Sequence, residues 1–243
     1  HTVSYGLQQA MAYAQMLDIP FAYSSNGDGF YEHDFLTGSE RQIRIDEFPT
    51  VEELSSRVKQ EANGGTGLSD AEETIINQPY YSSQTTYSPR YYQRIAINRT
   101  VEAIAKGQNR LLLVMATGTG KTYTAFQIIY RLLKSGLKKK VLYLADRNIL
   151  VDQSIAQDFQ PLEKTIHKIN FAKDDPTTIT SHEVYFSLYQ QLAGDEEELE
   201  NDDTVSRFEQ LFNKNFFDLV VVDECHRGSA KTASNWHKIL EYF

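Results

Sequence analysis

The stretch from Leu111 to Thr122 limits what this chain can fold into more than any other. An apolar run of strand length, Leu111–Met115, leads into a loop with two glycines, which is followed by Lys121-Thr122 and a helical pattern. Glycines let backbone N–H groups turn inward around an anion, and the N-terminus of the following helix carries a partial positive charge. This order of elements is typical of a phosphate-binding loop. Met115 stands where the usual pattern has its first glycine.

The residues of this loop have distinct expected roles toward a nucleotide. Lys121 would reach the β- and γ-phosphates, and the hydroxyl of Thr122 would bind Mg²⁺. The remaining expected contacts come from the loop itself, at Thr117, Gly118, Thr119 and Gly120. The sequence therefore predicts a site for a nucleotide with Mg²⁺.

A second strand-end feature lies further along the chain. The apolar run Leu219–Val222 is followed at once by Asp223 and Glu224. In ATPases built on a parallel sheet, an aspartate at this place holds Mg²⁺ and a glutamate can orient the attacking water. Adjacent acids at a strand end are common by themselves. Together with a phosphate-binding loop, they favour nucleotide hydrolysis.

Strand and helix patterns alternate from Pro89 onward. Helices are predicted over 91–106, 122–135 and 149–159, and strands over 111–115, 141–145, 183–189 and 218–222. Helices between apolar strands predict an α/β fold, with a parallel sheet covered by helices on both faces. Ligands of such sheets bind at the carboxyl ends of the strands, where the phosphate-binding loop is expected.

The first part of the chain has a different pattern. A helix over 5–17 is followed by strand patterns over 21–24, 30–35 and 42–45, which indicate the tail of a small α/β domain in residues 1–49. A helix over 50–61 precedes a glycine cluster, so residues 50–84 are expected to be a helix and a linker. Residues 85–243 would then form the larger domain.

Charge is unevenly distributed along the chain. Residues 1–84 carry 4 basic and 13 acidic side chains, whereas residues 85–243 carry 20 of each. Seven of the later acids lie in one run, Asp195–Asp203, which is typical of a solvated loop. The overall charge of −9 therefore does not exclude a nucleic-acid partner. The single cysteine, Cys225, is compatible with a reducing cytoplasm, and the apolar runs are too short to cross a bilayer.

Four segments resemble the motifs of superfamily 2 helicases and translocases. Asp223-Glu224-Cys225-His226 resembles motif II, and Met115–Thr122 resembles motif I. Gln93, in Tyr91-Tyr92-Gln93, lies where this superfamily places the glutamine that contacts adenine, although a glutamine at a helix start is also ordinary. Leu144–Asn148 looks like motif Ia, which implies that Arg147 contacts the DNA backbone; the alternative is a plain surface arginine.

The same segments, extended to Pro89–Arg94 and Asp223–Gly228 and joined by Phe186–Leu192, look most like the restriction (R) subunit of type I restriction–modification enzymes. The resemblance implies a RecA-like motor lobe in residues 85–243, preceded by the C-terminal part of a PD-(D/E)xK nuclease-like domain. It also implies ATP and Mg²⁺ as cofactors. The implied partners are double-stranded DNA and the methyltransferase and specificity subunits, in the cytoplasm.

The resemblance gives residues 1–49 a meaning as well. In this nuclease class a Gln-x-x-x-Tyr element on a helix follows the metal-binding carboxylates, and Gln9 and Tyr13 have this spacing. Side chains four residues apart share one helix face. The two residues are therefore expected to support a nuclease site, and the alternative for Tyr13 is a core aromatic.

Two other functions stay open at this point. One is a different superfamily 2 motor, such as a repair helicase or a type III restriction subunit. The other is a regulatory module that binds a nucleotide without hydrolysing it. The chain starts without methionine and its motifs stop before motif III, so we expect a fragment whose own ATP turnover is slow, because a second lobe would supply an arginine finger.

Overall fold

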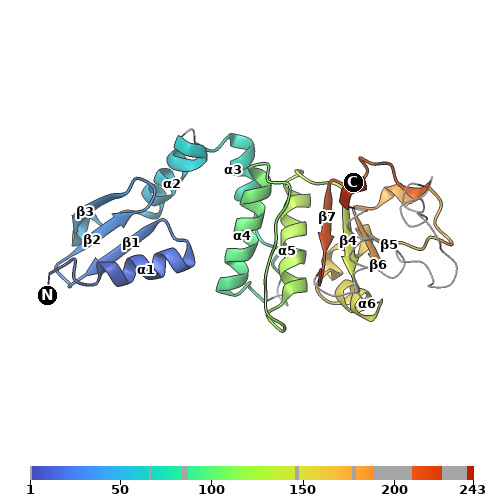
Figure 1. Ribbon diagram of the computed structural model, residues 1–243, viewed down its shortest axis with the longest axis horizontal. Helices are drawn as coiled ribbons and strands as arrows, with labels where there is room; N and C mark the ends of the chain where they lie inside the picture. Colours follow the sequence, from blue (N-terminus) through green and yellow to red (C-terminus); the bar gives the residue numbers. More distant parts are fainter. Residues whose placement is uncertain are drawn as a thin grey trace. The chain divides into compact units, whose positions relative to one another are not determined.

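The computed structural model describes residues 2–65, 67–83, 87–145, 148–176, 179–188, 210–225 and 240–243 (Figure 1). These residues form two compact units, residues 1–73 and 74–243, each with its own sheet. Helix α3 (Asp70–Ile76) spans the boundary between the two units.

The first unit is a small antiparallel sheet with a helix packed on it. Its elements are α1 (Leu7–Leu17), β1 (Phe21–Ser25), β2 (Gly29–Asp34), β3 (Ser39–Arg44), the 3-10 helix η1 (Ile45–Glu47) and α2 (Val51–Gly65). The strands follow the order β1-β2-β3, and Gly27 adopts a φ of 96° in the turn between the first two. Helix α1 buries Leu7 and Ala14, and ends at Asp18 in the left-handed conformation.

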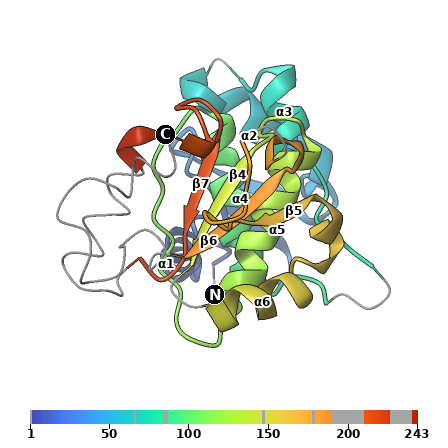
Figure 2. The same cartoon turned by 90° about the vertical axis from the view of Figure 1, so that its right-hand side faces the viewer.

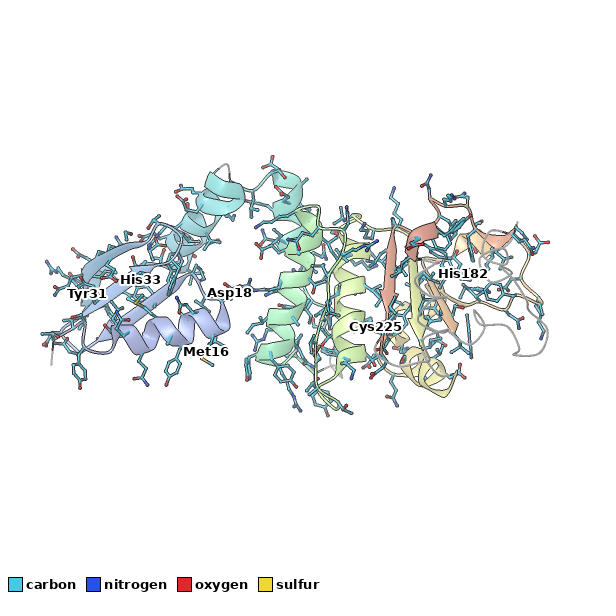
Figure 3. The ribbon with its side chains drawn as sticks, in the orientation of Figure 1. Met16, Asp18, Tyr31, His33, His182 and Cys225 are labelled. Carbon is cyan, nitrogen blue, oxygen red and sulfur yellow. The ribbon has the colours of Figure 1, made fainter. Side chains whose placement is uncertain are left out.

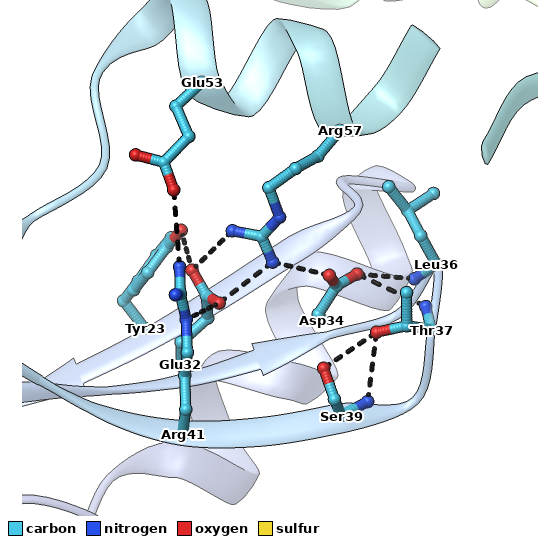
Figure 4. A network of polar contacts seen from close by, with 9 residues as sticks. All are labelled: Tyr23, Glu32, Asp34, Leu36, Thr37, Ser39, Arg41, Glu53 and Arg57. Carbon is cyan, nitrogen blue, oxygen red and sulfur yellow. Dashed lines mark hydrogen bonds and ion pairs between the residues drawn. The ribbon is translucent and has the colours of Figure 1, made fainter. Parts of the chain in front are cut away.

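Helix α2 is fastened to the sheet by a polar network (Figure 4). Glu32 and Asp34 lie two residues apart on β2, so both side chains point to the same face, and both are buried. Arg57 of α2 donates to both carboxylates, at 2.9 Å from Glu32 Oε1 and 2.5 Å from Asp34 Oδ2. Arg41 and the hydroxyl of Tyr23 also donate to Glu32. Each buried charge therefore has a partner.

The network changes the acidity of Glu32. Burial by itself raises the pKa of this carboxyl, but the hydrogen bonds from Arg57, Tyr23 and Arg41 outweigh burial and lower the pKa to about 2. The same contact with Glu32 raises the pKa of Arg57. Both groups are therefore charged at neutral pH.

The second unit is built on a parallel sheet (Figure 2). Its elements are α4 (Tyr91–Ala105), α5 (Lys121–Lys134), β4 (Val141–Ala145), α6 (Asn148–Ala156), η2 (Gln160–Thr165), β5 (Ile166–Lys168), η3 (Ile179–Ser181), β6 (Val184–Leu188) and β7 (Leu219–Val222). The strand order is β5-β6-β4-β7, and every pair is parallel. The α/β fold predicted from the alternating pattern is confirmed.

Alternate residues of the central strand β4 bury opposite faces of this sheet. Tyr143 packs with Phe126 of α5 and Val151 of α6 on the face that the two helices cover. Leu142 and Leu144 point to the other face, where the described residues include η3 and an aromatic cluster with Phe212 and Phe217. Helix α4 packs on α5 through Ile97, Val101, Ile128 and Leu132 (Figure 1).

The strand predicted over 111–115 is wrong in this structure. The segment pairs with no described strand, and Leu112 and Val114 are 76% and 89% exposed. An apolar run becomes a strand only where a neighbour takes its backbone N–H and C=O groups. Leu111 and Leu113 instead line a groove of about 450 Å³ along α4, with Ala96 and Ala103 on the helix side. Apolar character predicted the strand, but no pairing supports it.

Candidate nucleotide site

The loop between residue 115 and α5 has the shape that its glycines permit. Gly118 and Gly120 adopt φ angles of 78° and 80°, in the left-handed region that disfavours side chains. Thr119 closes the turn, since its N–H and its hydroxyl both donate to the carbonyl of Ala116, at 3.3 and 2.6 Å. Helix α5 begins directly after the turn at Lys121, so its free N–H groups face the loop.

The two acids predicted from the second motif lie at the carboxyl end of β7. This strand pairs with β4, and the N–H of Asp223 continues the pairing by donating to the carbonyl of Leu144 at 2.9 Å. The next residue, Glu224, turns out of the strand with a φ of 52°. Its Oε1 atom lies 2.9 Å from Nζ of Lys121, with side chains that are 14% and 27% exposed. The two motifs therefore meet at one edge of the sheet.

Asp223 is less acidic than an ordinary aspartate. Burial raises the pKa of its carboxyl, and the hydroxyl of Tyr143, which donates to Oδ2 at 3.1 Å, partly offsets this rise. The charge of Glu224 raises the pKa further, and that of Lys121 lowers it. A divalent cation at this carboxylate would favour its charged form.

Gln93 lies against the phosphate-binding loop. The side chain is buried, and its Nε2 donates to the carbonyl of Thr119 at 2.9 Å. Its Oε1 accepts the N–H of Arg90 at 2.8 Å and so caps α4. A Cβ added at Gly120 would meet Nε2 of Gln93 at 2.5 Å. The glutamine therefore supports the loop backbone in this structure, and a contact with adenine stays a prediction.

The remaining predicted residues lie partly inside and partly outside the described part of the chain. Thr122 is half-buried in the first turn of α5, next to Lys121, and Thr117 lies in the loop. Arg147, the expected DNA contact, lies outside the described residues, as does His226. Cys225 follows the two acids and has a free thiol (Figure 3).

Gln9 and Tyr13 are brought together in the first unit. Nε2 of Gln9 donates to the hydroxyl of Tyr13 at 2.8 Å on an exposed face of α1. Tyr13 is 57% exposed, so it is not a core aromatic in this structure. Met16 projects from the same helix into solvent (Figure 3). The role of Gln9 and Tyr13 toward DNA stays a prediction.

Sequence reasoning missed Tyr143. The residue was part of an apolar strand pattern, and only the register between β4 and β7 shows that its hydroxyl reaches Asp223. A tyrosine in an otherwise aliphatic parallel strand could have indicated it, because a buried hydroxyl needs a partner.

The residues at this edge fit a nucleotide with a divalent cation. Lys121 offers a cation for phosphate oxygens, while Thr122 and Asp223 offer the oxygen ligands that Mg²⁺ prefers. Within the described part of the chain, no group of three or more His, Cys, Asp or Glu side chains is placed to hold a metal ion. Beside a nucleotide, Mg²⁺ is commonly held by one or two protein ligands together with phosphates.

The parallel sheet, the glycine loop and the paired acids define a RecA-like nucleotide-binding lobe. The chain belongs to the family described as type III restriction enzyme, res subunit, whose model matches residues 86–243. The resemblance to the R subunit of type I restriction enzymes is also confirmed, and it extends over both units.

Three relatives carry this resemblance. The chain is 47% identical over 247 residues to the type I restriction enzyme EcoAI endonuclease subunit of Escherichia coli. This match covers all of this chain and 29% of that protein. It is 30% identical to the EcoKI endonuclease subunit of E. coli K12, over 88% of this chain and 18% of that one. A fragment structure described as the HsdR subunit of a type I restriction enzyme from Vibrio vulnificus YJ016 superposes with a TM-score of 0.72 at 34% identity. The matched region covers the whole of this chain and 39% of the Vibrio vulnificus chain.

This chain thus spans less than a third of the two E. coli relatives. None of the helices that the structure describes is long and apolar enough to cross a membrane.

Proposed function

We propose that this chain is the part of a type I restriction R subunit that binds ATP·Mg²⁺ and contributes to ATP-driven translocation and cleavage of double-stranded DNA. The observation that carries the proposal is the meeting of Lys121 and Glu224 at 2.9 Å, beside Asp223 and at the start of α5. Similarity to type I endonuclease subunits along the whole chain supports it.

Each residue of the site has a defined task in this proposal. Lys121 leaves Glu224 and binds the β- and γ-phosphates, which are more highly charged than a carboxylate. Thr122 and Asp223 would hold Mg²⁺, and that ion would neutralise charge on the phosphates. Glu224, released from the lysine, orients the attacking water. The loop, Thr117–Gly120, surrounds the phosphates with main-chain N–H groups.

The proposal extends to partners and to the remaining predicted residues. The names of the relatives point to a restriction complex, so we infer methyltransferase and specificity subunits as protein partners. Arg147 is proposed to contact the DNA backbone, and Gln93 to contact the adenine ring. Gln9 and Tyr13 are proposed to orient DNA or to support nuclease ligands, because neither side chain binds a divalent ion tightly.

Titration calorimetry on the full-length protein tests the nucleotide site. Lys121→Ala is expected to weaken ATP·Mg²⁺ binding at least ten-fold, since the phosphates lose a point charge. Lys134→Ala, in the last turn of the same helix, is the matched control and should bind as wild type does. Equal affinities for wild type and Lys121→Ala would contradict the assignment. Turnover of bound ATP in the presence of DNA then separates a motor from a module that binds without hydrolysis.

A further inference from the structure

Three polar side chains form a strip along one side of α5. Tyr123, Gln127 and Arg131 follow one another at intervals of four residues, which places them on one helix face. Each donates a hydrogen bond to a main-chain carbonyl of the segment that precedes α4. We call this segment the connector, and define it as residues 76–83 together with Tyr87.

The hydrogen bonds follow the connector from one end to the other. Nη2 of Arg131 donates to the carbonyl of Ile76 at 2.5 Å, and the hydroxyl of Tyr123 donates to the carbonyl of Tyr87 at 2.7 Å. Between them, Nε2 of Gln127 donates to the carbonyl of Tyr81 at 3.1 Å. The start of the connector therefore lies at the C-terminal end of α5, and its end lies near the phosphate-binding loop.

Gln127 is the centre of the strip. Its side chain is 0% exposed, and its Oε1 also accepts the N–H of Tyr81 at 2.9 Å. The amide thus pairs with both main-chain groups of one residue, as a neighbouring strand would. Nε2 of Gln127 also donates to the hydroxyl of Tyr123 at 2.9 Å, which links two members of the strip. A buried amide is costly to leave unpaired, so this pairing resists separation of helix and connector.

Aromatic contacts reinforce the same attachment. The ring of Tyr81 packs edge-on against Phe126 and Tyr130 of α5, with centroids 5.6 and 5.2 Å apart. The guanidinium of Arg131, which is 3% exposed, lies 5.0 Å from the ring centre of Tyr80. Arg131 and the hydroxyl of Tyr80 both donate to Oδ1 of Asn98 on α4. The connector is therefore fixed to two helices of the lobe.

Arg131 is an unusual choice for a purely structural role. Burial lowers the pKa of its guanidinium, and the atoms that accept its hydrogen bonds are neutral oxygens. Among the described residues, its buried Nε has no hydrogen-bond partner. Apolar side chains of similar size would pack here at lower cost. What the polar strip provides instead is a fixed position of the connector backbone relative to the helix.

We propose that the strip couples the nucleotide site to the chain that enters from the first unit. Tyr123 lies two residues after Lys121, on the helix whose N-terminus faces the proposed phosphate site. A helix shifts as a rigid element, so a displacement caused by a nucleotide at Lys121 is passed to all three attachment points. The connector continues through α3 into the first unit, where Gln9 and Tyr13 lie. Tyr123, Gln127 and Arg131 are therefore positioning residues for cleavage, an inference that rests on the proposed function.

The test uses the full-length protein and three variants. Gln127→Leu keeps the bulk of the side chain and removes both hydrogen bonds to Tyr81. Tyr123→Phe removes only the hydroxyl that reaches Tyr87. Tyr130→Phe is the matched control, since it deletes one hydroxyl from the same helix while leaving the ring on Tyr81. ATP affinity, DNA-stimulated ATP hydrolysis and DNA cleavage are measured separately, together with hydrogen exchange of the peptide that contains the Tyr81 amide.

Coupling predicts a specific pattern of results. In wild type, a non-hydrolysable ATP analogue changes the exchange of the Tyr81 peptide, and in Gln127→Leu this change is absent. Gln127→Leu binds and hydrolyses ATP within about two-fold of wild type, but cleaves at least ten-fold less per ATP hydrolysed. Tyr123→Phe gives a smaller loss of the same ratio, and Tyr130→Phe gives none. If Gln127→Leu does not fold, coupling is tested by comparing DNA cleavage per ATP hydrolysed between Tyr123→Phe and Tyr130→Phe.

Two results would overturn the coupling. One is wild-type cleavage per ATP in Tyr123→Phe and, where it folds, in Gln127→Leu. The other is an equal loss of ATP hydrolysis and cleavage, which marks a structural role alone. Both are distinct from failure of the proposed function, which is detected by wild-type ATP affinity in Lys121→Ala.

Discussion

Nζ of Lys121 and Oε1 of Glu224 form an ion pair at 2.9 Å, although the two residues lie more than a hundred positions apart in the sequence. Lys121 is proposed to bind the phosphates, and Glu224 is proposed to orient the attacking water. In the proposed function, the phosphates would take the place of the Glu224 carboxylate at this ammonium group. ATP and the carboxylate would then compete for Lys121.

This competition predicts the effect of Glu224→Gln. Removing the negative charge frees Lys121, so ATP affinity should rise a few-fold, in line with about 1 kcal/mol for a half-buried ion pair. Hydrolysis should fall at least 100-fold, because the amide orients water poorly. Calorimetry and phosphate release on the full-length protein measure the two effects. Glu102→Gln, which breaks the exposed pair with Lys106, is the control and should change neither. Weaker ATP binding by Glu224→Gln would refute the competition.

The two loop glycines should respond differently to an added methyl group. Gly118→Ala meets nothing within 4 Å, so its cost is limited to the positive φ, about 1 kcal/mol. Gly120→Ala has the same backbone strain and also places Cβ 2.5 Å from Nε2 of Gln93, which must move away from Thr119. We expect Gly120→Ala to lower ATP affinity more than Gly118→Ala. Equal affinities for the two variants would show that Gln93 has no part in shaping the loop.

The polar network of the first unit predicts a large effect of Arg57→Ala. The substitution leaves the buried carboxylates of Glu32 and Asp34 without their shared cation, at a cost of about 3–5 kcal/mol. Arg44→Ala removes an arginine whose pair with Asp46 is exposed, so it should cost less than about 1 kcal/mol. Denaturant unfolding compares the two variants. Similar midpoints would mean that the network does not hold α2 on the sheet.

The lowered pKa of Glu32 predicts how stability depends on pH. A carboxyl whose folded pKa lies below its unfolded value stabilises the folded state above the unfolded pKa, and this contribution is lost as pH falls through the folded pKa. With values near 4.5 unfolded and about 2 folded, the loss falls between about pH 4.5 and pH 2 and amounts to at most about 3 kcal/mol. Thermal melts across this range should show a flatter pH dependence for Glu32→Gln than for wild type. Parallel curves would contradict the assignment to Glu32.

Much of the fold could be predicted because periodicity is local. The helix expected over 122–135 is observed as α5 at Lys121–Lys134, and the strand expected over 141–145 is β4 itself. Helix α3 was missed, although Ser69 and Glu72 form a reciprocal cap that a Ser-x-x-Glu pattern indicates. Its sequence lies in a polar stretch, which favoured the prediction of a linker over the helix that the capping pattern indicates.

Contacts between distant elements could be predicted only in part. Strand-end logic placed the phosphate loop and Asp223-Glu224 at one edge of a parallel sheet, and the structure brings Lys121 and Glu224 together there. The prediction of a strand over 111–115 was wrong because hydrophobicity does not specify a pairing partner. Arg57 and Glu32 are 25 residues apart and meet through the packing of α2 on β2, which no local pattern encodes.

The left-handed backbone of Glu224 has a consequence for substitutions at this position. A glycine would adopt a φ of 52° without strain, and asparagine would do so at lower cost than glutamate. Glutamate at this position therefore combines a strained backbone with a carboxylate that contacts Lys121. A change to glycine should relieve the strain but remove the ion pair and, under the proposed function, ATP turnover with it.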